Sequence, residues 1–246
     1  MQKELSVLVG GQAGEGIRRA GVLIAKLLNR CGYNIFIYDE YPSLIRGGHN
    51  FSVVRASEEK IFAHRSNLDL ILALNKDAIE RHGVKLTPKG FILFDKDKTK
   101  AEGVGISLTE IVNSLGGKEI MRNVALIGAF AKAVGIKWEV VEEVLKREMP
   151  KQKELNIRIS KEAYTQASTL IEIKLIQKEP VALLTGNEAI ALGAVKAGLG
   201  MYLGYPMTPA SSLLHYLAAS SKDLGIITIH PENVLNTMAG HLRWKN

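Results

Sequence analysis

The chain has 246 residues, of which 46% are hydrophobic and 23% charged, and its formal net charge at pH 7 is +7. This composition is typical of a globular protein long enough for one large or two modest domains, and its apolar runs are too short to span a bilayer. The single cysteine, Cys31, excludes an intramolecular disulfide and cannot supply the ligands of an iron–sulfur cluster or a structural zinc site. No signal-peptide pattern is visible, so we expect a cytoplasmic protein with no membrane partner.

The positive charge does not have the pattern of a nucleic-acid site. The excess lies in residues 1–180, in mixed-sign stretches such as Lys96, Asp97 and Lys98, without interleaved aromatic residues for base stacking. A solvated face is the simpler interpretation, although a basic surface also attracts an anionic cofactor or an acidic electron carrier. We therefore predict no nucleic-acid partner.

A strand, a glycine-rich loop and a helix are predicted at the start of the chain. The apolar run 5–9 leads into four glycines within the seven residues 10–16, and helical spacing of apolar residues resumes over 17–30. A second strand is predicted at 34–38. Strand, helix and strand with a short connection indicate a right-handed βαβ unit.

The glycine loop departs from both common phosphate-binding motifs. Ala13 occupies the middle glycine position of a dinucleotide fingerprint that would run from Gly11 to Gly16. A P-loop would need Lys and Ser or Thr where Ile17 and Arg18 stand, so ATP hydrolysis is not expected. The residues alone leave two alternatives, contact with a phosphate or a role in packing or at an interface.

Glu15 and the loop 40–50 bear on these alternatives. The Glu15 carboxylate suits the start of a helix but repels a pyrophosphate. The loop 40–50 contains a fixed cation, Arg46, followed by Gly47 and Gly48, a double glycine that would let backbone N–H groups face a partner. An ordinary ordered loop explains this segment equally well.

The rest of the first domain alternates strands and helices. A β-hairpin is predicted over 51–64, and core strands over 68–74 and 91–94. Helices are predicted at 76–82, 110–115, 123–134, 138–147 and 155–176. The histidines His49, His64 and His82 show no metal-ligand spacing, so surface or loop positions are expected.

A domain boundary is predicted at residues 177–180, where Pro180 ends a polar stretch. Beyond it the composition shifts to few charges and many glycines, with strands predicted at 181–184, 201–203 and 226–229. Helix starts favour hydroxyl side chains, so Thr208 and the serines after it are interpreted as helix caps on physical grounds alone. The predicted domains are 1–180 and 181–246.

Two groups of motifs resemble a known family. GGQAGEGI followed by a helix and by EYPSLIRGGHN resembles the γ-type domain of 2-oxoacid:ferredoxin (acceptor) oxidoreductases. LLTGNEAIALGAVKAG followed by GYPMTPASS resembles the beginning of their α subunit. The resemblance implies an α/β fold class: a γ-type α/β domain with a parallel or mixed sheet over 1–180, and an incomplete thiamine-diphosphate pyrimidine-binding-type α/β domain over 181–246.

The resemblance also implies an activity. Enzymes of this family decarboxylate a 2-oxo acid oxidatively to an acyl-CoA and pass the electrons to ferredoxin. Thiamine diphosphate and Mg²⁺ would then lie at an interface with another subunit, coenzyme A would be a co-substrate, and the iron–sulfur cluster would lie on a partner chain. The expected partners are a β-type subunit and ferredoxin, in a hetero-oligomer or homodimer.

Site residues follow from matching motifs. In GYPMTP, Thr208 corresponds to the family's substrate-contacting threonine, and Tyr205 and Pro206 belong to the same substrate-binding motif. Glu232 is the candidate for the glutamate that activates the aminopyrimidine, although the residues after it depart from the family pattern. The candidate cofactor-binding residues, which would cover a coenzyme A face, are Gly11, Gly14, Gly16, Arg46, Gly47 and Gly48. No metal site is expected on this chain.

The α-like portion, residues 181–246, has only 66 residues, whereas the family's pyrimidine-binding domain is considerably longer. We therefore expect a fragment or split subunit that is inactive by itself. The alternative is a non-catalytic scaffold module that binds coenzyme A or a nucleotide.

Overall fold

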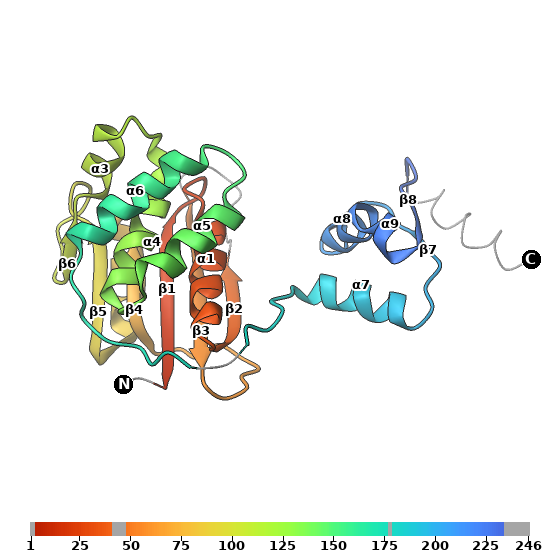
Figure 1. The fold of residues 1–246 in the computed structure, drawn as a ribbon, viewed down its shortest axis with the longest axis horizontal. Helices are drawn as coiled ribbons and strands as arrows, with labels where there is room; N and C mark the ends of the chain where they lie inside the picture. Colours follow the sequence, from red (N-terminus) through yellow and green to blue (C-terminus); the bar gives the residue numbers. More distant parts are fainter. Residues whose placement is uncertain (1–2, 41–47, 177–178, 234–246) are drawn as a thin grey trace, which may run out of the picture. The chain divides into compact units, whose positions relative to one another are not determined.

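The computed structural model describes residues 3–40, 48–176 and 179–233. The chain divides into two compact units, Met1–Val181 and Ala182–Asn246, and each is considered by itself (Figure 1). Both units combine helices with strands, so the α/β fold class is confirmed.

The first unit is built on a mixed six-stranded sheet with the order β2-β3-β1-β4-β5-β6. β3 runs antiparallel to both of its neighbours, whereas β1, β4, β5 and β6 pair in parallel. β1 and β2 therefore point in the same direction, as expected for a βαβ unit, but β3 lies between them. The strands are β1 (Glu4–Gln12), β2 (Asn34–Glu40), β3 (His49–Ser57), β4 (Leu68–Ala73), β5 (Leu86–Asp95) and β6 (Val104–Ile106).

The β-hairpin predicted over 51–64 is wrong. β3 is one strand that is paired along both edges, since Val53 lies opposite Leu8 of β1 and opposite Tyr38 of β2. The residues after it connect to β4 without forming a strand, and the side chain of Phe62 is 85% exposed. The alternating pattern at 51–55 was correct for a strand, but its partners are distant in the sequence.

Helices cover the sheet unequally. The helices are α1 (Ile17–Arg30), α2 (Lys76–His82), α3 (Leu108–Ser114), α4 (Arg122–Ala133), α5 (Trp138–Glu148) and α6 (Lys153–Gln166), with single 3-10 turns at η1 (Gly83–Lys85) and η2 (Glu119–Met121). Figure 1 shows α1, α4, α5 and α6 in front of the sheet. The short helix α2 instead contributes Ala78 to a cluster with Leu8 and Val53.

The helix predicted over 155–176 ends at Gln166. The following residues run along the end of α4, where the N–H groups of Leu170 and Ile171 donate to the Ala133 carbonyl at 2.9 and 3.0 Å. Farther on, the Ile176 N–H donates to the Cys31 carbonyl at 2.9 Å. These tertiary hydrogen bonds replace the helical ones, which is why the apolar spacing of the segment was misleading.

The second unit is small. It comprises α7 (Gly186–Lys196), β7 (Met201–Leu203), α8 (Ser211–Ala219), α9 (Ser221–Leu224) and β8 (Ile227–Ile229). β7 and β8 form a two-stranded parallel sheet, and Ala191, Leu217 and Ile226 form the buried core.

The third strand predicted for this unit, at 181–184, is wrong. These residues form no strand, and Val181 and Leu184 are 52% and 47% exposed. α7 starts directly after them with a capping box: the Glu188 N–H donates to the Thr185 hydroxyl, and the Thr185 N–H donates to the Glu188 carboxylate. In the part of the chain that the structure describes, no helix is long and apolar enough to cross a bilayer.

Candidate functional site

The glycine loop lies where the parallel strands of the first unit end, which is the edge at which α/β sheets bind ligands. The loop closes on itself and on β3. The Gln12 N–H donates to the Glu15 carboxylate at 2.6 Å, and the Glu15 N–H donates to the Gln12 carbonyl at 3.1 Å. The Ala13 N–H donates to the Gly48 carbonyl at 2.8 Å. Three loop N–H groups are therefore already paired within the protein.

The predicted glycines are required for different reasons. A Cβ at Gly11 would overlap the Glu15 carboxylate, and a Cβ at Gly16 would overlap the Asn123 amide. Gly14 has open space around it, but its φ of +101° is in the region that favours glycine. Packing thus accounts for Gly11, packing and a φ of +75° together account for Gly16, and Gly14 forms an open corner of the loop.

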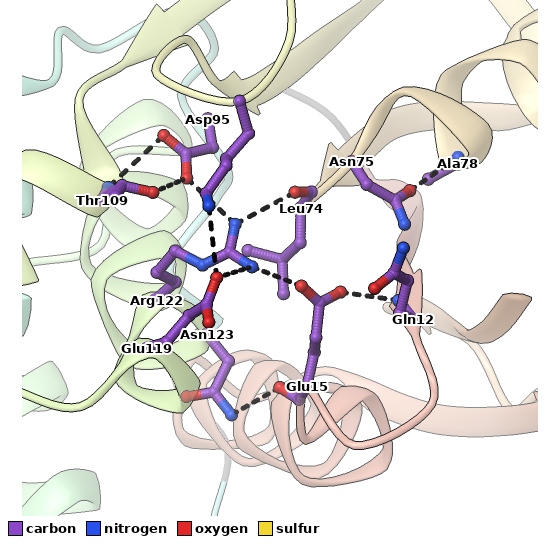
Figure 2. A network of polar contacts seen from close by, with 11 residues as sticks. Gln12, Glu15, Leu74, Asn75, Ala78, Asp95, Thr109, Glu119, Arg122 and Asn123 are labelled. Carbon is purple, nitrogen blue, oxygen red and sulfur yellow. Dashed lines mark hydrogen bonds and ion pairs between the residues drawn. The ribbon is translucent and has the colours of Figure 1, made fainter. Parts of the chain in front are cut away.

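A buried guanidinium, which the sequence did not reveal, organises this edge (Figure 2). Arg122 begins α4, and its side chain is 5% exposed. Its Nη1 donates to Asp95 Oδ2 at 3.1 Å and to the Leu74 carbonyl at 3.2 Å, while Nη2 donates to Glu15. Asp95 also accepts the Thr109 hydroxyl at 2.6 Å. The ends of β4 and β5 and the loop after β1 are thereby joined at one side chain.

A cleft of about 380 Å³ opens beside this network. It is lined by Gln12, Glu15, Leu74, Asn75, Lys76, Asp77, Lys98, Thr99, Glu119 and Arg122. The lining carries three cationic and three carboxylate side chains, so its formal charges cancel. Two of the carboxylates are paired inside the lining itself: Glu15 with Arg122, and Glu119 with Lys98 at 3.3 Å.

Two histidines do not lie where they were predicted. His49 and His82 are buried at 7% and 5% exposure, whereas only His64 is exposed as expected. Burial, and then the neighbouring His49, lower the pKa of His82 to about 4. Burial also lowers the pKa of His49, against the opposing effect of Asp77. The pair joins β3 to α2, and its partners are too far apart in the sequence for a local pattern to indicate it.

The candidate residues of the second unit follow the ends of the two strands of its small sheet. β7 and β8 are parallel with Leu203 opposite Ile229, and the Gly204 N–H donates to the Ile229 carbonyl at 3.1 Å. The segment with Tyr205, Pro206 and Thr208 follows β7, and Glu232 follows β8. Both of the residues expected to be catalytic are exposed. The structure therefore brings the two segments to the same side of the sheet.

Thr208 does not cap a helix, because α8 starts after Ala210 without a side-chain cap. Asn187, at the start of α7, holds the turn instead. Its amide donates to the Pro209 carbonyl at 2.9 Å and to the Ser212 hydroxyl. The Thr208 hydroxyl is left at the surface of the turn.

Arg46 and Gly47 lie outside the described residues, whereas Gly48 is anchored by its bond from Ala13. Over residues 3–40, 48–176 and 179–233, no group of three or more His, Cys, Asp or Glu side chains is arranged to hold a metal ion.

Comparison with known proteins identifies the family. A family model described as pyruvate ferredoxin/flavodoxin oxidoreductase matches residues 6–166. The chain belongs to this family. The resemblance read from the motifs is thus confirmed.

Relatives of the chain are named as subunits of a 2-oxoacid:ferredoxin oxidoreductase and of a 2-oxoglutarate synthase. The chain is 21% identical over 277 residues to 2-oxoacid:ferredoxin oxidoreductase 2, subunit alpha, of Aeropyrum pernix, covering 89% of this chain and 43% of that protein. It is 26% identical over 156 residues to 2-oxoglutarate synthase subunit KorC of Archaeoglobus fulgidus, covering 63% of this chain and 83% of that one.

Solved structures give the same picture. The 2-oxoglutarate:ferredoxin oxidoreductase of Magnetococcus marinus, with 2-oxoglutarate, coenzyme A and succinyl-CoA bound, matches with a TM-score of 0.82 and 25% identity over 98% of this chain and 45% of that chain. The γ subunit of a keto/oxoacid ferredoxin oxidoreductase from Geobacter sulfurreducens shares the fold over 67% of this chain, with a TM-score of 0.58 and 23% identity, covering 97% of that chain. The chain spans less than half the length of the Aeropyrum α subunit and of the Magnetococcus chain.

Proposed function

We propose that this chain is part of a 2-oxoacid:ferredoxin oxidoreductase, which decarboxylates a 2-oxo acid oxidatively to an acyl-CoA and passes the electrons to ferredoxin. The observation that carries the proposal is the likeness over 98% of the chain to the Magnetococcus enzyme that binds 2-oxoglutarate and coenzyme A. Residues 1–180 are then the γ-type domain, and 181–246 form the N-terminal part of an α-type pyrimidine-binding domain.

The second unit presents residues that fit a site for thiamine diphosphate. This cofactor, held with Mg²⁺ at an interface with another subunit, supplies the carbon nucleophile for decarboxylation. The Glu232 carboxylate would accept a hydrogen bond from the aminopyrimidine, and the Thr208 hydroxyl would orient the substrate beside Tyr205 and Pro206. Support comes from the small sheet, because both segments leave its carboxyl edge and both side chains are exposed.

The first unit is proposed to contact coenzyme A. The cleft beside the glycine loop lies at the carboxyl edge of the sheet, and Gly14 gives a ligand open access to the backbone. The segment Arg46, Gly47 and Gly48 precedes β3, whose first residues pair with the end of β1. A ligand on the loop would therefore lie close to Gly48.

Electron transfer requires another chain. Cys31 is the only cysteine of the sequence, and burial raises the pKa of its thiol to about 11. A buried protonated thiol is a poor metal ligand. We therefore assign the iron–sulfur cluster to a β-type subunit, which would form a hetero-oligomer with this chain in the cytoplasm and reduce ferredoxin.

The test is reconstitution. The chain is co-expressed with a β-type subunit that carries thiamine-diphosphate and cluster-ligand motifs, and reduction of a viologen dye is followed with a panel of 2-oxo acids and coenzyme A. We expect co-purification and dye reduction that depends on both substrates, while the isolated chain is inactive. Binding of coenzyme A without any partner or turnover would instead favour the non-catalytic binding module.

A further inference from the structure

The Glu15 carboxylate occupies a position where two hydrogen-bond donors converge. Arg122 Nη2 donates to one carboxylate oxygen, and the Gln12 N–H donates to the other at 2.6 Å. Figure 2 shows Glu15 between these two groups. A guanidinium and a backbone N–H directed at the two oxygens of one group form the arrangement with which proteins bind carboxylate and phosphate ligands.

The two donors are held in place independently of Glu15. Arg122 is fixed through its other nitrogen by Asp95 and by the Leu74 carbonyl, at 3.1 and 3.2 Å. Gln12 is the last residue of β1, where it lies opposite His49 of β3. Because neither anchor involves the Glu15 side chain, turning this side chain away would leave a preformed pair of donors.

The geometry of the loop allows that movement. Glu15 lies between Gly14 and Gly16, with φ of +101° and +75°, and neither neighbour carries a side chain. The Asn123 amide donates to the Glu15 carbonyl at 3.1 Å, so the backbone is held while the side chain, 17% exposed, faces the open cleft.

A third donor lies in the wall of the same cleft. The Thr99 hydroxyl is buried and has no hydrogen-bond partner among the described residues. A buried unpaired hydroxyl is unfavourable unless a ligand or water pairs with it. Glu119 also lies 3.6 Å from Arg122 Nη2, but it is 69% exposed and is paired with Lys98. Glu119 therefore leaves the space between the two donors open, whereas the Glu15 carboxylate fills it.

We propose that Arg122, the Gln12 N–H and Thr99 form an oxyanion-binding subsite, and that the Glu15 carboxylate is its intramolecular occupant. A ligand bearing a phosphoryl or carboxylate group binds there by displacing Glu15, which makes Glu15 a built-in competitor. This resolves the apparent conflict between a glycine loop and an acidic residue within it. The inference does not depend on catalysis, because it concerns anion binding to this chain alone.

The test compares two single-charge variants of the full chain. Glu15→Ala removes the occupant, and Glu119→Ala removes the same charge from the same cleft but leaves Glu15 paired with both donors. Binding of pyrophosphate and of malonate is measured by isothermal titration calorimetry at low and high salt. We expect Glu15→Ala to bind one of these anions at least about tenfold more tightly than the parent chain, and Glu119→Ala to change the affinity less than about threefold.

The outcomes separate the explanations. Preference for pyrophosphate identifies a phosphoryl ligand, and preference for malonate identifies a carboxylate ligand; the gain must disappear in Glu15→Ala/Arg122→Gln. Glu15→Gln, which keeps the side-chain volume, should change the affinity in the same direction but less, and serves if the alanine variant does not fold. A folded Glu15→Ala chain with unchanged affinity, or an equal gain in Glu119→Ala, would overturn the proposal. Neither result bears on the reconstitution test, which measures turnover.

Discussion

The Nε2 atoms of His49 and His82 lie 2.8 Å apart in the interior of the first unit. At this distance one nitrogen must carry a hydrogen and the other must offer its lone pair. The contact therefore cannot persist when both imidazoles are charged. Since His49 immediately follows Gly48 and His82 ends α2, the pair fastens the beginning of β3 to the helix on that face of the sheet.

Acid should destabilise the first unit through this pair. The folded pKa of His82 is about 4, below the ordinary value of 6.5, so the unfolded chain binds the proton first as the pH falls. The stabilisation that depends on a neutral His82 is thus fully present above about pH 6.5 and is lost as the pH falls towards 4. We expect the free energy of unfolding in urea, followed by circular dichroism, to be lower at pH 5 than at pH 7 by about 1–2 kcal/mol.

Two variants make this prediction specific. His82→Gln should reduce the dependence of stability on pH between 5 and 7, although Asp77, 3.5 Å from His49 Nδ1, still influences the remaining histidine. His64 is the matched control, since it is exposed and stacks on Tyr38 with ring centroids 4.3 Å apart. Equal pH dependence in His82→Gln and His64→Gln would show that the buried pair is not the cause.

Removing the Arg122 guanidinium should destabilise the first unit strongly. Arg122→Met would leave Asp95, which is fully buried, without its cation. Breaking a buried ion pair in this way costs about 3–5 kcal/mol. The matched control is Arg147→Met, because Arg147 is 65% exposed and pairs with Glu143 at 3.8 Å, an arrangement worth less than about 1 kcal/mol. The loss in the free energy of unfolding, measured in urea, should therefore be several-fold larger for Arg122→Met than for Arg147→Met. Similar losses in the two variants would contradict the role given to Arg122.

Local sequence patterns were sufficient for most helices of the first unit. The periodicity of α1, α4 and α5 is sustained over three or more turns, and Pro150 marks the end of α5. The site was not predictable in the same way. Arg122 and Glu15 are 107 residues apart, and His49 and His82 are 33 apart, so no local pattern links them.

The glycine loop shows both what local sequence patterns predict and what they miss. Its existence and its position after a strand followed from the sequence alone. The reasons for Gly16, however, are its φ of +75° and the Asn123 amide, which approaches from α4. The helix predicted for the residues after α6 is wrong because of tertiary hydrogen bonds. The apolar spacing of these residues suits a helix, but their hydrogen bonds to Ala133 and Cys31 replace the helical ones. In both cases a tertiary contact decided the outcome.

Gly128 should be intolerant of even one methyl group. It lies within α4 where that helix packs against α6, and a Cβ there would overlap the Ser160 carbonyl. Alanine favours a helix by about 1 kcal/mol over glycine, but overpacking typically costs about 1–3 kcal/mol. Since a backbone atom cannot move aside, we expect Gly128→Ala to be net destabilising in urea unfolding.

The control is Gly83→Ala in the same unit. Gly83 has nothing within 4 Å of its would-be Cβ, and its φ is −54°. Alanine there should be neutral or stabilise by up to about 1 kcal/mol, because it only restricts the unfolded chain. A stabilising Gly128→Ala would contradict the close approach of the Ser160 carbonyl to α4.

Thr208 and Glu232 should matter for turnover and not for folding. Both are exposed in the isolated chain, so Thr208→Val and Glu232→Gln should leave its thermal unfolding unchanged. In the reconstituted enzyme, Glu232→Gln keeps the shape of the side chain but removes the carboxylate. Loss of such an acid–base group lowers kcat by about 100- to 10,000-fold. Thr208→Val should act on kcat and KM for the 2-oxo acid, since it removes a hydroxyl proposed to orient the substrate.

Thr228→Val is the matched control for Thr208→Val. Thr228 belongs to β8 and lies opposite Tyr202 of β7, so the substitution removes a hydroxyl from the small sheet but not from its carboxyl edge. We expect near-parental dye reduction from this variant. If Thr228→Val lost as much turnover as Thr208→Val, the small sheet would be sensitive to any substitution and the hydroxyl of Thr208 would have no special role. A difference of tenfold or more, about 1.4 kcal/mol in the activation barrier, would assign the effect to the edge where the segments with Thr208 and Glu232 emerge.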